Sequence, residues 1–156
     1  MEKVFGDVTL IDKKANKIQP SSLNSKQVVG LYFSAHWCPP CRGFTPVFAE
    51  AYRKIISSGK SFEVIFVSSD QTESQFNEYY AEMPWLALPL SAKAEKNRLS
   101  TQYGINGIPS LILLDGATGS VISMEGRSII MQDPNGEKFP WENFSVDNKK
   151  GGCLAS

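Results

Sequence analysis

The segment FSAHWCPPCRGF, at residues 33–44, constrains the fold more than any other part of the chain. It begins inside the apolar run VVGLYFSA (28–35), which is rich in β-branched and aromatic residues and has little polar alternation. Such a run is typical of a strand buried on both faces of a sheet. From Pro39 to about Ser57, apolar residues recur at spacings of three and four, which predicts an amphipathic helix with a bend at Pro46. The sequence therefore predicts a buried strand that leads, through two cysteines, directly into a helix.

The rest of the chain alternates between strand and helix patterns. We predict a short strand at 8–12, a second buried strand at 62–70, helices at 72–82 and 92–103, and a hairpin of strands 110–115 and 121–126 around the turn GATG. Strands that alternate with helices and end in a hairpin indicate an α/β fold. We expect a central mixed β-sheet flanked by helices on both faces.

The length of 156 residues fits one domain with a core that needs neither disulfides nor metals for stability. We assign residues 1–140 to this domain. Residues 141–156 lose the apolar periodicity and end in NKKGGCLAS, so we expect a flexible C-terminal tail there.

Charge and hydropathy exclude several classes of partner. The 16 basic and 16 acidic residues give a formal net charge of zero, which offers no electrostatic case for a nucleic-acid partner. No window reaches the roughly 18 apolar residues that a membrane span requires, and the N-terminus has no long apolar segment. We expect a protein of the cytosol or nucleus.

The two cysteines of the CPPC segment are placed for different roles. Cys38 falls at the helix N-cap, where unpaired N–H groups and the positive end of the helix dipole stabilise a thiolate. Pro39 and Pro40 have no N–H to offer, which leaves the N–H of Cys41 to bind the Cys38 sulfur. Cys41 follows one helical turn later, with its backbone inside the helix. We predict that Cys38 is an exposed nucleophile and that Cys41 is a buried resolving thiol.

Two structural alternatives for the cysteine pair are less favoured. A structural disulfide is uncommon in a reducing compartment. A tetrahedral zinc site needs two more ligands, and His36 and the distant Cys153 are poor candidates for them. We therefore predict an exchange pair and no metal site.

Five motifs occur in an order that resembles a known family: FSAHWCPPCRGFTP, EVIFVSSD, MPWLALP, YGINGIPSLILLD and EKFPW. From about residue 5 to Trp141, the chain resembles the tryparedoxin and nucleoredoxin branch of the thioredoxin superfamily. The resemblance implies a thioredoxin-like fold, with Cys38 as the attacking cysteine and Cys41 as the resolving one. It also implies that Trp37 is the aromatic residue beside the active site and that Pro109 is the cis-proline facing it.

The resemblance also suggests where substrate binds. A cis bond between Ile108 and Pro109 would leave backbone groups free to pair with an extended substrate strand, whereas a trans turn proline is the ordinary expectation for such a bond. We name as candidate substrate-binding residues Trp37, Pro39, Pro40, Ile108, Pro109 and Arg127. Arg127 is suited to bind the carboxylates of a glutathione-like partner, and the alternative is a surface ion pair. Trp85, in the MPWLALP motif, is expected to pack in the core.

One departure from the family leaves a question open. Many thioredoxins have a buried acid six positions before the first cysteine, and this chain has Tyr32 there. No residue of the sequence stands out as the proton acceptor for Cys41.

The expected function is that of a thiol–disulfide oxidoreductase that reduces protein disulfides. It would be a monomer without a bound cofactor, and its electrons would come from an external dithiol, glutathione or an NADPH-linked reductase. The alternative is a redox-sensing interaction module that binds a signalling partner according to the oxidation state of Cys38 and Cys41. Both hypotheses require the same residues.

The C-terminal sequence CLAS fits the pattern for farnesylation, at Cys153. A single lipid chain beside two lysines would give only weak, reversible membrane association. The alternative is an unmodified thiol.

Overall fold

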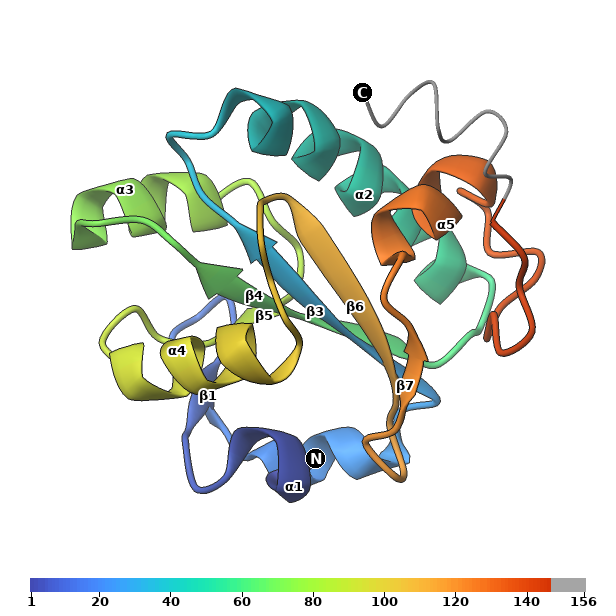
Figure 1. Cartoon of the computed structure of the whole chain (residues 1–156), viewed down its shortest axis with the longest axis horizontal. Helices are drawn as coiled ribbons and strands as arrows, with labels where there is room; N and C mark the ends of the chain where they lie inside the picture. Colours follow the sequence, from blue (N-terminus) through green and yellow to red (C-terminus); the bar gives the residue numbers. More distant parts are fainter. Residues whose placement is uncertain (147–156) are drawn as a thin grey trace.

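The computed structural model describes residues 1–146. Its strands are β1 (Leu10–Ile11), β2 (Lys17–Ile18), β3 (Val28–Ser34), β4 (Phe62–Ser68), β5 (Leu86–Ala87), β6 (Ser110–Asp115) and β7 (Val121–Ser123). Its helices are α1 (Glu2–Phe5), α2 (Pro39–Ser57), α3 (Glu73–Tyr80), α4 (Lys93–Gln102), α5 (Gly126–Gln132) and the 3-10 helix η1 (Pro20–Ser25). The strands form one mixed sheet in the order β2-β1-β5-β4-β3-β6-β7 (Figure 1). The predicted α/β fold is confirmed.

The three long strands form the centre of the sheet. β3 runs parallel to β4 and antiparallel to β6. Every residue of β3 is buried, because successive side chains enter cores on opposite faces: Tyr32 enters one, and Leu31 and Phe33 enter the other. Burial on both faces explains why this run has no polar alternation. The strands predicted at 28–35, 62–70 and 110–115 are confirmed to within two residues.

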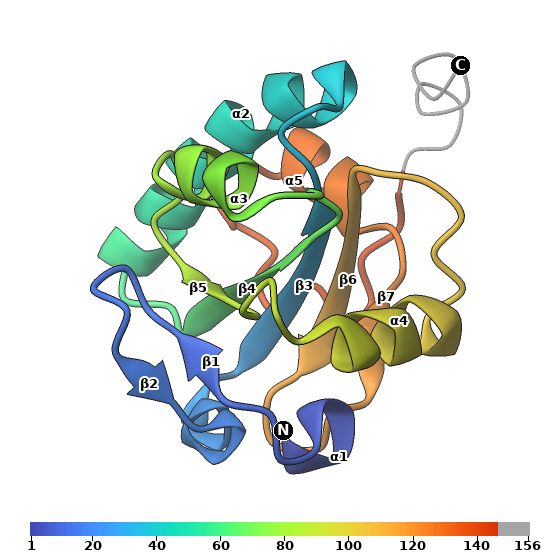
Figure 2. The ribbon, with the colours of Figure 1, turned by 90° about the vertical axis from the view of Figure 1, so that its left-hand side faces the viewer.

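Helices cover both faces of the sheet, as Figure 2 shows. α2, α3 and α5 contribute to the core on one face, while α1, η1 and α4 contribute to the core on the other. The larger core is rich in aromatic rings. Trp85 is 1% exposed, and its ring centroid lies 4.6 Å from that of Phe48 and 5.4 Å from that of Tyr52. The packing role predicted for Trp85 is confirmed.

Several short elements are absent from the sequence-based prediction: α1, η1, β2, β5 and α5. Strands of two residues contain no measurable period, so pattern analysis cannot find them. The second strand of the predicted hairpin ends at Ser123, and α5 begins at Gly126. A Cβ atom on Gly126 would lie 2.6 Å from Leu111 Cγ, so a glycine is required where α5 starts against β6.

Packing against the core continues closer to the C-terminus than the sequence suggests. Trp141, assigned to the flexible tail, is 2% exposed, and its ring centroid lies 5.4 Å from that of Phe62. Its indole N–H donates to Asp133 Oδ2 at 2.9 Å, and Asp133 also accepts two backbone N–H groups. Packing against the core extends to Val146. The predicted lipidation site, Cys153, lies outside the described residues.

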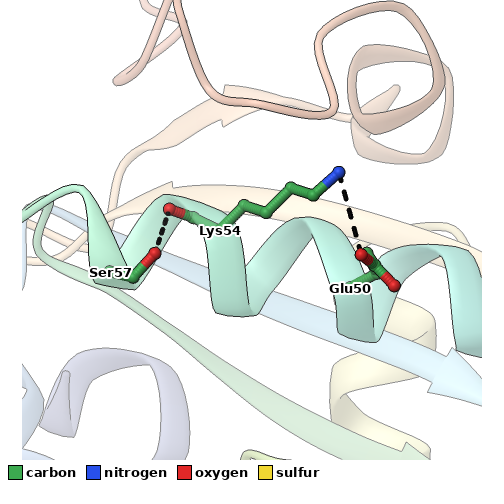
Figure 3. Close-up of polar contacts among 3 residues, drawn as sticks. All are labelled: Glu50, Lys54 and Ser57. Carbon is green, nitrogen blue, oxygen red and sulfur yellow. Dashed lines mark hydrogen bonds and ion pairs between the residues drawn. The ribbon is translucent and has the colours of Figure 1, made fainter.

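The interactions on the outer face of α2 contribute little to the stability of the fold. Figure 3 shows Lys54 Nζ 3.8 Å from Glu50 Oε1, and the Ser57 hydroxyl donating to the Lys54 carbonyl at 3.0 Å. Both partners of the ion pair are largely exposed, and such pairs contribute only about 0–1 kcal/mol. The helix is therefore held by its buried face. None of the helices within residues 1–146 has the length and apolar character needed to cross a membrane.

Candidate active site

Cys38 occupies the N-cap of α2, with extended backbone, and Pro39 and Pro40 are the first two helical residues. The N–H of Cys41 donates to Cys38 Sγ across 3.4 Å. The first N–H groups of a helix have no partner inside the helix, and here the sulfur of Cys38 supplies one for the N–H of Cys41. The predicted N-cap position of Cys38 and its bond from the Cys41 N–H are confirmed.

Both cysteines are free thiols, and they differ in exposure less than predicted. Cys41 is fully buried, as expected. Cys38 is only 5% exposed, although the sequence predicts an exposed nucleophile. The reason is the loop before β6: its Ile108 carbonyl lies 3.8 Å from Cys38 Sγ and covers part of the sulfur.

The loop before β6 forms one wall of a cavity. The Ile108–Pro109 peptide bond is cis, as the family resemblance implies. Beside it lies a cavity of about 440 Å³, lined by residues 103–110 together with Ile112, Met124 and Arg127. The structure thus brings Ile108, Pro109 and Arg127 to one cavity, and Ile108 connects that cavity to Cys38.

Arg127 lies on α5 and is exposed. Its guanidinium carbon lies 5.8 Å from the ring centroid of Phe44, a buried residue of α2. The surface ion pair considered from the sequence is not formed, because the single ion pair within the described part of the chain joins Glu50 and Lys54. The guanidinium of Arg127 therefore borders the cavity without an acidic partner among residues 1–146.

Trp37 directly precedes Cys38 in the chain and is 51% exposed. Its indole N–H donates to the Ser69 carbonyl at 3.1 Å. This bond links the segment between β3 and α2 to the residue that follows β4. Asp70, which the sequence did not single out, does the same: Oδ1 accepts the His36 N–H at 2.8 Å. In the sequence, the only sign of this contact was the polar run Ser68, Ser69 and Asp70 at the end of β4.

The described residues contain no group of three or more His, Cys, Asp or Glu side chains that is able to hold a metal ion. A metal ion bound by His36 and Cys38 would therefore find no further ligand within residues 1–146. Cys153 is outside this range.

The thioredoxin-like family model matches residues 25–121, which include both cysteines and the cis-proline. The chain belongs to the thioredoxin-like family. Its relatives in this family include tryparedoxin of Trypanosoma brucei brucei, which is 43% identical over 143 residues, covering 92% of this chain and 98% of the relative. Nucleoredoxin of Danio rerio is 49% identical over 135 residues, covering 81% of this chain.

This thioredoxin-like chain spans about a third of the length of the nucleoredoxins, with 32% of the zebrafish protein covered. Among solved structures, tryparedoxin II in complex with glutathionylspermidine has a TM-score of 0.83 and 38% identity, covering 91% of this chain and 98% of that one. Both tryparedoxins and nucleoredoxins are therefore relatives of this chain.

In this thioredoxin-like chain, four hydroxyl groups gather beside Cys41, where many relatives of the superfamily have a carboxylate. The Tyr32 and Thr45 hydroxyls lie 2.6 Å apart, and the Ser34 hydroxyl lies 2.6 Å from that of Tyr79. All four side chains are buried. The sequence alone gives no sign of this group beside Cys41, because its residues come from three separate segments.

Burial is the main influence on Cys41 and raises the pKa of its thiol to about 11. A hydrogen bond with Cys38 raises this pKa further, whereas hydrogen bonds from the Ser34 side chain and the Ala35 backbone lower it. Cys41 is therefore a thiol at neutral pH and needs help to lose its proton.

We predict that Cys41 titrates above the ordinary cysteine value of 9.0. In a Cys38→Ser, Cys153→Ser variant, the ultraviolet absorbance of the thiolate should rise with a midpoint between 9.0 and about 11, because burial favours the neutral thiol. A midpoint at or below 9.0 would show that Cys41 is not held as a thiol.

Proposed function

We propose that the chain reduces protein disulfides by dithiol–disulfide exchange through Cys38 and Cys41. The observation that carries this proposal is the asymmetry of the pair at the start of α2. The sulfur of Cys38 accepts a helix N–H and borders the Ile108 carbonyl, while Cys41 is wholly buried behind it. One sulfur is placed to meet a substrate, and the other is placed to meet only its partner.

The exchange proceeds in two steps. The Cys38 thiolate attacks a sulfur of the substrate disulfide; a Cys38–substrate bond forms, and the substrate disulfide breaks and releases one thiol. Cys41 then attacks Cys38, the Cys38–Cys41 disulfide forms, and the second substrate thiol leaves. Two electrons pass from the cysteine pair to the substrate, and an external thiol donor restores them.

The surface around Cys38 supports binding of an extended peptide that carries a negative charge. Trp37 offers an exposed apolar face, and the cavity beside Pro109 has Arg127 at its wall. The related tryparedoxin II forms a complex with glutathionylspermidine, a glutathione derivative, which supports a glutathione-like thiol as electron donor. An external dithiol or an NADPH-linked reductase would serve the same role. We place the protein in the cytosol or nucleus as a monomer without bound cofactor.

The test is reduction of a purified protein disulfide by the chain in the presence of dithiothreitol. The proposal predicts a rate well above that of dithiothreitol alone, with many turnovers per protein molecule. If the rate equals the background, and a partner is retained equally by the wild type and by a variant lacking both cysteines, the chain is an interaction module instead.

Arg127→Ala should weaken reaction with glutathione disulfide and spare a neutral disulfide. Loss of one charge-assisted contact, worth about 1.5–3 kcal/mol, lowers kcat/KM for the anionic substrate by about 10- to 100-fold, mainly through KM. Lys93→Ala, which removes a positive charge from α4, is the matched control. An equal decrease of kcat/KM with both disulfides would show that Arg127 does not recognise the charge of the substrate.

A further inference from the structure

Four buried hydroxyl groups form one hydrogen-bonded cluster beside Cys41. Tyr32 and Ser34 come from β3, Thr45 comes from α2, and Tyr79 comes from α3. We call these four residues the hydroxyl cluster. They lie on the face of the sheet that α2 covers, where the Thr45 hydroxyl donates to the Cys41 carbonyl at 3.0 Å. Hydrogen bonding by the Ser34 side chain lowers the pKa of the Cys41 thiol. Burying four polar groups is costly unless each has a partner, and here each does.

The protons of the cluster can be placed from its contacts. Thr45 donates to the Cys41 carbonyl at 3.0 Å, so its oxygen accepts from the hydroxyls of Tyr32 and Tyr79. Tyr79 is then an acceptor for Ser34. The Ser34 proton is directed to Tyr79 at 2.6 Å, with Tyr32 as a longer acceptor at 3.3 Å, so the Ser34 oxygen has a lone pair free for the Cys41 S–H group.

The same contacts allow a second arrangement. The bond between Ser34 and Tyr79 can run in either direction. If Tyr79 donates to Ser34, the Ser34 proton turns to the Cys41 sulfur. Thr45 then turns its proton from the Cys41 carbonyl to the Tyr79 hydroxyl and keeps the hydroxyl of Tyr32 as its donor. The cluster thus accepts from a thiol in one arrangement and donates to a thiolate in the other, without moving a heavy atom.

We propose that the hydroxyl cluster stabilises the Cys41 thiolate during the resolving step, with Ser34 as the group that donates a hydrogen bond to the sulfur. Tyr32, Thr45 and Tyr79 are positioning residues that orient the Ser34 hydroxyl. This inference rests on the proposed function, since it assigns the groups that assist its second step. It answers the question raised by Tyr32, which stands where a buried acid occurs in many thioredoxins.

The step balances without another reactant. The Cys41 S–H bond breaks, the Cys41–Cys38 disulfide forms, and the bond between Cys38 and the substrate breaks. The proton of Cys41 ends on the departing substrate sulfur, and the electron pair of the broken disulfide leaves with that sulfur. Ser34 gives up no proton: it turns its hydroxyl toward the negative charge while that charge exists.

A neutral cluster suits a resolving thiol that must remain protonated until it is needed. None of the groups that shift the pKa of Cys41 is a carboxylate. The titratable groups on the elements around it are Cys38 on its own helix, Tyr32 on β3, Tyr79 on α3, and beyond Tyr79 the ring of His36 and the carboxylate of Asp70. Hydroxyls, unlike a buried carboxylate, add no charge that would have to be compensated.

The experiment separates the two steps in a single turnover. A disulfide whose two halves give different chromophoric thiols is mixed with the reduced protein. Release of the first thiol reports attack by Cys38, and release of the second reports attack by Cys41. The variants are Ser34→Ala and Tyr79→Phe, and the control is Tyr52→Phe, which removes a buried hydroxyl that bonds Glu63 at 2.8 Å.

Ser34→Ala should leave the first release unchanged and slow the second by about 10- to 100-fold at neutral pH, as expected for loss of one group that assists proton removal. The slow step should recover at alkaline pH, and the midpoint of the Cys41 titration should move upward. Tyr79→Phe should give a smaller effect of the same kind. Tyr52→Phe should change neither step.

The outcomes are distinguishable from failure of the proposed function. If wild-type protein releases no first thiol, Cys38 is not the nucleophile and the proposed function fails. If the first release is normal and Ser34→Ala and Tyr79→Phe both leave the rate and pH profile of the second unchanged, the proposal for the hydroxyl cluster is overturned. A purely structural role would slow both steps together, which also contradicts it.

Discussion

Cys38→Ser is expected to reduce turnover of a protein disulfide to the background rate of the reductant. The sulfur that accepts the Cys41 N–H and faces the Ile108 carbonyl is then gone, and a serine hydroxyl cannot attack a disulfide at neutral pH. Steady-state reduction of a protein disulfide measures the loss. The fold should be intact, which near-ultraviolet circular dichroism can verify.

Two companion variants sharpen this result. Cys41→Ser should still attack the substrate through Cys38 and then stop, so mass spectrometry should find the substrate covalently attached to Cys38. Cys153→Ser, which changes the third cysteine of the chain, should keep full activity. Full activity of Cys38→Ser would refute the mechanism, and absence of any trapped adduct with Cys41→Ser would refute its division of roles.

Trp141→Ala is expected to destabilise the protein by about 3–5 kcal/mol, the usual cost of emptying a large buried site. Trp141 is 2% exposed, packs against the rings of Phe62 and Phe139, and donates its indole N–H to Asp133. The substitution also removes a donor from a carboxylate that organises the end of α5. Urea denaturation of the reduced protein measures the change.

Trp37→Ala is the matched control, since it removes the same side chain from an exposed position. It should cost less than about 1 kcal/mol, because surface substitutions usually have small effects. Similar losses for the two variants would mean that the segment around Trp141 does not pack as described.

Long apolar runs made much of the fold predictable. β3, β4 and β6 are six or seven residues long and buried, so each appears in the sequence as a continuous apolar run. The strand β5, which the sequence did not reveal, has only two residues, and its pairing with β1 depends on a neighbour far away in the sequence. Trp141 was misplaced for a related reason: it packs from an aperiodic segment, where no repeat signals burial.

The cysteine pair was predictable because its chemistry is local: N-cap, prolines and resolving thiol are adjacent in sequence. The covering of Cys38 by Ile108 depends instead on a contact between residues 70 positions apart. The hydroxyl cluster was harder still. Serine, threonine and tyrosine are common residues, and only the fold brings Ser34 of β3 and Tyr79 of α3 within hydrogen-bond distance.

Cys38 and Cys41 are expected to form a reversible exchange pair. The decisive measurement is to equilibrate the protein with thiol buffers of graded redox potential, block the free thiols and count them by mass spectrometry. We expect a single reversible two-electron transition that is retained in Cys153→Ser and lost in both Cys38→Ser and Cys41→Ser. If the two thiols stay reduced at every potential, or the transition survives in Cys41→Ser, Cys38 and Cys41 are not an exchange pair.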